Sequence, residues 1–226
     1  MSVFKFTKKL FLGNVAGEGA QATTGYNGYK EQLVYLKKIW EDSTYGVERV
    51  VRLFICLVQF IYPTIFIRSV FGKLGMRARK VAVEGYIIIK LVLPLIVLGT
   101  GIYRYAFVAV IIIYLLSETL FHILGLIFLS DLHPFSISYR RSILLLFLHY
   151  LEVIFDFSVI YLAFDLLNRS LSPLSALYFS FVTNTTLGYG DIYPKGAAGE
   201  ITVIAQLIIF IMFVILFIDY FSSKSK

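Results

Sequence analysis

Long apolar stretches separated by short polar connectors dominate the chain after residue 82. A helix needs about 20 apolar residues to cross a bilayer, and four stretches have that length. Each of them predicts a transmembrane helix, although the first contains Lys90 and Pro94 and the second contains Glu118 and His122. The four predicted spans are residues 83–101, 105–129, 142–166 and 200–221.

The apolar stretches before residue 83 are shorter. Residues 53–67 are uncharged but number only 15, lie between Arg52 and Arg68, and are broken by Pro63. This pattern favours an interfacial or half-buried helix, and a fifth span with snorkelling arginines is the alternative. Residues 30–48 predict a helix with one apolar stripe, lying on the membrane or packed in the cytosol.

Composition excludes a soluble protein. Hydrophobic residues make up 58% of the chain, charged residues only 15%, and the mean hydropathy is +0.80, whereas an average soluble domain is about a quarter charged. The net charge is +7, and residues 1–80 hold 13 of the 21 lysines and arginines but 5 of the 14 acidic residues. A basic block beside apolar helices fits the cytoplasmic face of a membrane better than nucleic-acid binding. The single cysteine, Cys56, excludes an intramolecular disulfide.

The basic blocks also predict the orientation of the spans. Residues 73–80 and 140–141 bracket the first helical hairpin, so both belong on the inner side of the membrane. Residues 168–199 are then outside, and both termini are cytoplasmic. We therefore expect a multi-pass protein of the cell membrane with a basic cytoplasmic region, residues 1–82, followed by a peripheral hairpin, residues 83–130.

Residues 167–199 do not resemble an ordinary loop. Pro173 opens a helix of 10 to 12 residues, which is too short to span a membrane. Thr183-Asn-Thr-Thr-Leu-Gly-Tyr-Gly-Asp191 follows it. The pattern predicts a short helix that dips into the membrane and a glycine-broken strand that leads out. Irregular backbone at that depth is tolerated only where protein buries it or where it lines a watery path.

The run Thr186-Leu-Gly-Tyr-Gly-Asp191 resembles the selectivity filter of the tetrameric potassium-channel pore family, with Leu187 where that family has valine. The resemblance implies an all-α membrane protein with four transmembrane helices per subunit, a re-entrant pore helix, an extended filter and a homotetrameric pore. We assign residues 131–226 as the pore domain; the resemblance itself begins at residue 142, and residues 1–141 resemble no family. The implied parts are outer helix 142–166, pore helix 173–185, filter 186–190 and inner helix 200–221.

The resemblance also assigns roles to residues at the filter. Backbone oxygens of the filter replace the water shell of potassium ions, and no other cofactor is implied. Asp191 supports the filter through a hydrogen bond from Tyr178, and Asn184 either bonds behind the filter or caps the pore helix. The coordinating residues are Thr186, Leu187, Gly188, Tyr189 and Gly190, and the supporting residues are Asp191, Tyr178 and Thr185.

The inner helix contains no glycine at the position of the family's usual hinge. Ile211, Val214 and Ile218 recur at three and four positions, so they share one face. The family's spacing places them below the filter, and the alternative is a lipid-facing position. Asp219 either forms a ring of four carboxylates at the inner mouth or is an interfacial acid solvated by water.

Charged residues within membrane spans are costly and are candidate sites. Lys90 and Glu118 each lie 14 residues from Arg104, in the hairpin turn, so they should sit at similar depth. We predict that they form a structural ion pair, and snorkelling of Lys90 to the surface is the alternative. Glu152 and Asp156 share a helix face and are expected to seat against the pore helix or the hairpin.

These observations predict a potassium-selective channel that conducts passively and is not an enzyme. No span carries the regular arginines of a voltage sensor, so gating would act through residues 1–82, through anionic lipid there or through a separate regulatory protein. The alternatives are a weakly selective cation channel, a non-conducting scaffold and an effector that depolarises the membrane.

Overall fold

The computed structural model describes residues 27–42, 46–132 and 139–222, and within these ranges the regular elements are helices. The chain divides into two compact units, Met1–Tyr86 and Ile87–Lys226. The boundary between them falls inside one long helix, α5 (Met76–Thr100). Each unit is described by itself.

The N-terminal unit is built from α2 (Gly28–Glu41), α3 (Gly46–Val58), a short 3-10 helix η1 (Gln59–Ile61) and α4 (Pro63–Gly72), followed by the start of α5. Asn27 caps α2 by accepting a hydrogen bond from the Tyr29 backbone N–H at 3.0 Å. Helix α2 ends at Glu41, because Asp42 is extended, so the prediction of one helix over residues 30–48 is wrong at its C-terminal end.

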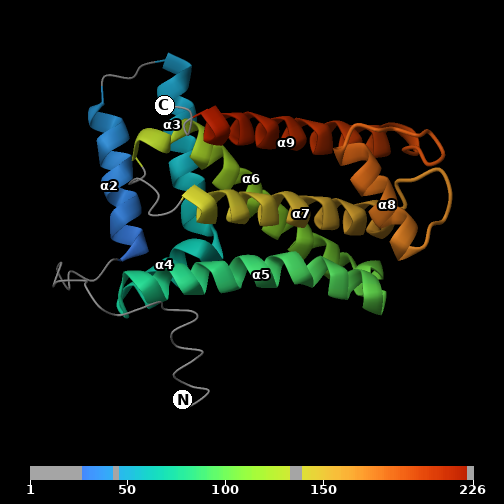
Figure 1. Cartoon of the computed structure of the whole chain (residues 1–226), viewed down its shortest axis with the longest axis horizontal. Coiled ribbons are helices and arrows are strands. Elements are labelled where there is room, and N and C mark those ends of the chain that lie inside the picture. The colour runs from blue at the N-terminus through green and yellow to red at the C-terminus, as the bar shows by residue number, and fades with distance from the viewer. Residues whose placement is uncertain (1–26, 43–45, 133–138, 223–226) are drawn as a thin grey trace, which may run out of the picture. The chain divides into compact units, whose positions relative to one another are not determined.

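Helices α2 and α3 lie side by side in opposite directions (Figure 1). The Gln32 side-chain nitrogen donates to the Cys56 carbonyl and to Gln59 Oε1, each at 2.9 Å. Arg52 is buried and pairs with Glu48 at 3.5 Å and with Asp42 at 3.8 Å, so it does not snorkel. The chain then bends by 70° into α4, which begins at Pro63 because proline suits the first helical position.

The second unit contains the remaining helices. Four helices are long and apolar enough to cross a membrane: α5, α6 (Ala106–Phe128), α7 (Tyr139–Ala163) and α9 (Gly196–Ser222). The bent pair α3 and α4 passes the same test only if it is counted as one broken span or a re-entrant loop. These are the four predicted spans of a multi-pass membrane protein. The short helix α8 (Pro173–Asn184) matches the predicted dipping helix.

Helix α5 begins at Met76, seven residues before the start of the predicted span at residue 83. Basic residues are unfavourable in a span, so the sequence predicts that Arg77, Arg79 and Lys80 lie in a connector. In the structure they lie in the first turns of α5. The structure buries Arg79 by pairing it with Glu31 of α2. The interruption between α4 and α5 therefore lies at Gly75, whose φ of +106° ends the turn that follows α4.

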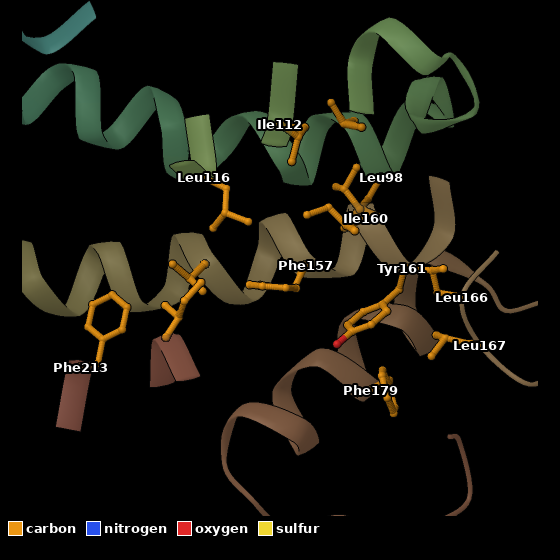
Figure 2. Packing of buried hydrophobic residues seen from close by; sticks show 14 of the residues in the cluster. Leu98, Ile112, Leu116, Phe157, Ile160, Tyr161, Leu166, Leu167, Phe179 and Phe213 are labelled. Atoms are coloured by element: carbon orange, nitrogen blue, oxygen red, sulfur yellow. The ribbon is translucent and has the colours of Figure 1, made fainter. Parts of the chain in front are cut away.

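Helix α7 is the centre of the second unit. Over half of its apolar window, 56%, is buried within the chain, against 22–39% for the other three spans. Figure 2 shows Phe157 and Ile160 of α7 between Leu98, Ile112 and Leu116 of the α5–α6 hairpin and the helices that carry Phe179 and Phe213. Helix α8 lies between the ends of α7 and α9 (Figure 1), so α7 positions everything that follows it.

Candidate functional site

The site begins with the short helix α8. Ser172 caps its N-terminus by accepting a hydrogen bond from the Ser175 backbone N–H at 3.2 Å, and Pro173 occupies its first turn. The helix has 12 residues, about 18 Å at 1.5 Å per residue, which is too short to cross a bilayer. Its carbonyl end, which carries the negative end of the helix dipole, leads directly into residues 185–190.

The backbone of residues 186–190 alternates in hand. Thr186, Gly188 and Gly190 have φ values of +57°, +56° and +78°, whereas Leu187 and Tyr189 between them do not have positive φ. When left-handed and right-handed backbone conformations alternate, successive peptide planes have the same orientation. Consecutive carbonyl groups can then point to one side of the strand. A Cβ at Gly188 or Gly190 would meet no atom within 4 Å, so backbone conformation rather than space requires glycine there.

Hydrogen bonds hold the segment from Thr185 to Lys195, which contains this strand, at both of its ends. At the inner end, the Leu187 backbone N–H donates to the Val182 carbonyl of α8 at 3.1 Å, and the Thr185 hydroxyl donates to the Phe181 carbonyl at 2.8 Å. At the outer end, the Lys195 N–H donates to the Leu166 carbonyl at 2.7 Å. Lys195 also forms an exposed salt bridge with Asp165 at 2.7 Å. The strand is therefore suspended between α8 and the segment that follows α7.

The structure brings Tyr178 and Asp191 together, as the sequence predicts. Desolvation, the negative charge of Asp191 and a hydrogen bond to its carboxylate raise the pKa of the Tyr178 hydroxyl. The hydroxyl is the donor in that bond. Asp191 thus lies just beyond the strand and is held from the pore-helix side.

A buried network behind α8 was not predicted. Gln206 of α9 accepts a hydrogen bond from the Tyr161 hydroxyl at 2.7 Å and donates to the Ser180 carbonyl and hydroxyl at 3.0 Å each. The Ser180 hydroxyl donates in turn to the Ile154 carbonyl of α7 at 2.7 Å. The polar side chains of this network are buried, so it joins α7, α8 and α9. The sequence feature that could have predicted this network is Gln206, because a polar side chain within an apolar span is a candidate site.

Asn184 does not cap α8, and the prediction that it bonds behind residues 186–190 stays open. It is fully buried at the end of α8. Its amide makes no hydrogen bond of ordinary geometry with the described residues, although it lies near enough to the Tyr150 hydroxyl to interact with it. The Thr185 backbone N–H closes the end of the helix instead, by donating to the Phe181 carbonyl at 2.9 Å.

One face of α9 is exposed and does not pack against the other described residues of the chain. It is a stripe of isoleucines, each at least half exposed, at intervals of three and four residues: Ile201, Ile204, Ile208, Ile211, Ile215 and Ile218. The opposite face, with Ile209, Phe213 and Leu216, is buried against the rest of the unit. The predicted lining residues Ile211 and Ile218 lie on the exposed stripe, Val214 lies at its margin, and Asp219 is exposed.

A second buried network joins the hairpin to α7. Lys90 Nζ lies 3.5 Å from Glu118 Oε2, as predicted, but only 3.0 Å from Glu152 Oε1. Thr119 accepts a hydrogen bond from Lys90 at 2.5 Å and donates one to Glu152 at 2.7 Å. His149 Nδ1 is 2.8 Å from Glu152 Oε2. Lys90 is buried in this network and does not snorkel, and Glu152 seats against the hairpin rather than α8.

Two further residues border this network. Asp156 is buried, and its Oδ2 makes no hydrogen bond to the described residues. The rings of His122 and His149 lie with their centroids 5.2 Å apart. No group of three or more His, Cys, Asp or Glu side chains in the described ranges is placed to hold a metal ion.

Comparison with known proteins assigns part of the chain. Residues 144–225 match the family model described as "Ion channel". No curated protein and no solved structure matches the chain. The matched region contains α7, α8, the alternating strand and α9, and the residues before it are without assignment.

Proposed function

We propose that this protein is a potassium-selective channel, because residues 144–225 match the ion channel family model and the chain has the helix composition of a multi-pass membrane protein. The observation that carries the proposal is the Thr-Leu-Gly-Tyr-Gly strand with left-handed φ at Thr186, Gly188 and Gly190. Conduction is passive, down the electrochemical gradient, and the family is not enzymatic.

Selectivity follows from replacement of the ion's water shell. Backbone carbonyls of Thr186, Leu187, Gly188 and Tyr189 point toward the ion path, and the Thr186 hydroxyl completes the inner end. The oxygens of such a ring take the place of hydration water, as in potassium filters generally. The negative end of α8 faces the same path and favours a cation.

One chain supplies only part of each ring, so the working form is a homotetramer. Two exposed surfaces support this assembly. Leu187 and Tyr189 are 59% and 67% exposed in the single chain, although they alternate with three residues of left-handed backbone. The isoleucine stripe of α9 is a second apolar surface, and none of the described residues of the chain covers it.

The pore below the filter is lined by the exposed face of α9. Ile211, Val214 and Ile218 from four chains would form apolar rings that can close the path by dewetting. Asp219 would place four carboxylates at the inner mouth, which concentrates cations. This arrangement has both termini in the cytoplasm and the loop before α8 outside, as the positive-inside rule predicts.

Potassium flux from liposomes that contain the purified protein tests this function. Gly188→Asp should abolish the flux, because its carboxylate and Cβ disturb the ring. Gly101→Asp is the matched control, since Gly101 also has a positive φ, +75°, and open space around it, but lies in the α5–α6 turn. Flux that survives Gly101→Asp, that Gly188→Asp removes and that sodium does not carry supports the proposal.

Two other outcomes contradict it. Equal sodium and potassium flux would identify a weakly selective cation pore. Flux that is unaffected by Gly188→Asp would place the ion path elsewhere. If the channel serves as an effector that depolarises its own cell, expression should arrest growth, and Gly188→Asp should relieve the arrest.

A further inference from the structure

Helix α3 and η1 expose a continuous apolar stripe. Its members recur at intervals of three and four, and each is more than half exposed: Val47, Val50, Phe54, Leu57 and Ile61. The opposite face of α3 carries Arg52, Ile55 and Cys56, which are buried. Since the buried face contacts α2 through the Gln32 hydrogen bonds, the stripe points away from α2.

Helix α2 prevents α3 from crossing the membrane. It packs along α3 and is strongly charged, with Lys30, Glu31, Lys37, Lys38 and Glu41 among its 14 residues. A transmembrane α3 would carry these charges into the hydrocarbon, where charged side chains are very unfavourable. Helix α3 must therefore lie along a surface, with α2 on one side and the stripe on the other.

The bilayer is the surface within reach. Helix α4 ends at Gly72 and the first span begins at Met76, so three residues separate them, at most about 11 Å of extended chain. Arg79, in the first turns of that span, forms an ion pair with Glu31 of α2. Both connections hold the N-terminal unit beside the point at which α5 enters the membrane.

The end of the stripe carries interface chemistry. Trp40 is 65% exposed and lines a shallow groove together with Val47, Val50 and Leu53. The Arg49 guanidinium lies over the Trp40 ring, 4.7 Å from its centroid. Tryptophan is enriched at the headgroup level, and arginine attracts anionic headgroups. Residues 27–86 hold ten basic and five acidic residues, so the unit complements a negative leaflet.

We propose that the α3 stripe docks on the cytoplasmic leaflet of a bilayer that contains anionic phospholipid. Helix α3 lies in the membrane plane, with the stripe at the boundary of headgroups and acyl chains, where amphipathic helices insert by about 5–10 Å. Trp40 and Arg49 then sit at the headgroup level. The N-terminal unit is a peripheral membrane platform, and the inference does not depend on the ion selectivity of the pore.

The native tryptophan makes this testable in the intact protein, because Trp40 is the one tryptophan in the chain. The full-length protein is placed in nanodiscs whose lipids carry bromine either near the headgroup or deep in the acyl chain. Bromine quenches tryptophan fluorescence on contact. We expect blue-shifted emission, strong quenching by shallow bromine and weak quenching by deep bromine, and stronger quenching when part of the lipid is phosphatidylserine.

Two valine substitutions form a matched pair. Val50→Glu places a charge in the stripe, and Val34→Glu places one on α2, at a valine of nearly equal exposure, 66% and 62% respectively. Val50→Glu should remove most of the quenching, and Val34→Glu should leave it unchanged. Absence of quenching in the parent protein, equal effects of the two variants, or stronger quenching by deep than by shallow bromine would each overturn the proposal.

Discussion

The ion pair between Lys90 and Glu152 offers the sharpest test of the packing between the hairpin and α7. Its atoms lie 3.0 Å apart, and both side chains are buried, at 3% and 0% exposure. Among the described residues, Glu152 pairs with Lys90 and with His149. Lys90→Met removes the first of these two partners. Loss of one member of a buried pair costs about 3–5 kcal/mol, so we expect a loss of stability in that range.

The double variant separates an ion pair from two independent residues. Lys90→Met with Glu152→Gln removes both charges and keeps an amide that can bond to His149. It should therefore be less destabilised than the sum of the single variants, by about 1–3 kcal/mol of coupling. Lys90→Met with Glu118→Gln should show a smaller coupling, because that separation is 3.5 Å rather than 3.0 Å.

Unfolding in mixed micelles with increasing dodecyl sulfate, followed by helical circular dichroism, measures these differences. Lys90→Arg is the control that keeps the charge. If the losses of stability in Lys90→Met and Glu152→Gln simply add in the double variant, the two side chains do not interact. That result would refute the ion pair as a source of stability. Equal coupling to both acids would refute the ranking by distance.

Three further changes test other parts of the structure. Gln206→Leu removes three hydrogen bonds, at about 0.6 kcal/mol each in membranes. It should therefore cost about 2 kcal/mol by thermal melting and lower the potassium preference in reversal potentials. Gly188→D-Ala, made by semisynthesis, should keep potassium flux because D-residues suit a φ of +56°, whereas Gly188→Ala should reduce it. Burial and the nearby Glu31 raise the pKa of the Tyr35 hydroxyl from its usual 10.0 to about 12. The folded state therefore favours the protonated hydroxyl, and the stability that this gives below pH 10 is lost as the pH rises toward 12. Tyr35→Phe should remove this pH-dependent loss of stability, as measured by melts followed by Trp40 emission.

The spans could be predicted because bilayer thickness sets a minimum length for an apolar stretch, and all four stretches reach it. Their ends could not be predicted with equal accuracy. Helix α5 begins at Met76 because Arg79 finds Glu31, a residue 48 positions away. A local pattern contains no trace of that pairing, so basic residues in the first turns looked like a connector.

The site divides in the same way. The alternating strand could be located from Gly188 and Gly190, because their spacing reflects a backbone requirement that is local. The supports behind it depend on three helices meeting, and an uncharged amide such as Gln206 is a weaker signal in an apolar span than a charged side chain. Equal depth across one hairpin predicts that Lys90 meets Glu118, but the packing of a third helix, which brings Glu152 closer to Lys90, is not encoded in the spacing of the hairpin.

Helix α7 also has a mechanical consequence. The Glu152 side chain is bonded to the hairpin, and the Ile154 carbonyl, two residues later, is bonded to Ser180 of α8. Two residues of helix advance by about 3 Å, so the two attachments sit almost back to back on one stiff rod. A tilt or rotation of the hairpin is thereby transmitted to the base of the strand with little slack. A displacement of α5 and α6 would therefore reach α8, and with it residues 185–190, through two turns of α7 or less.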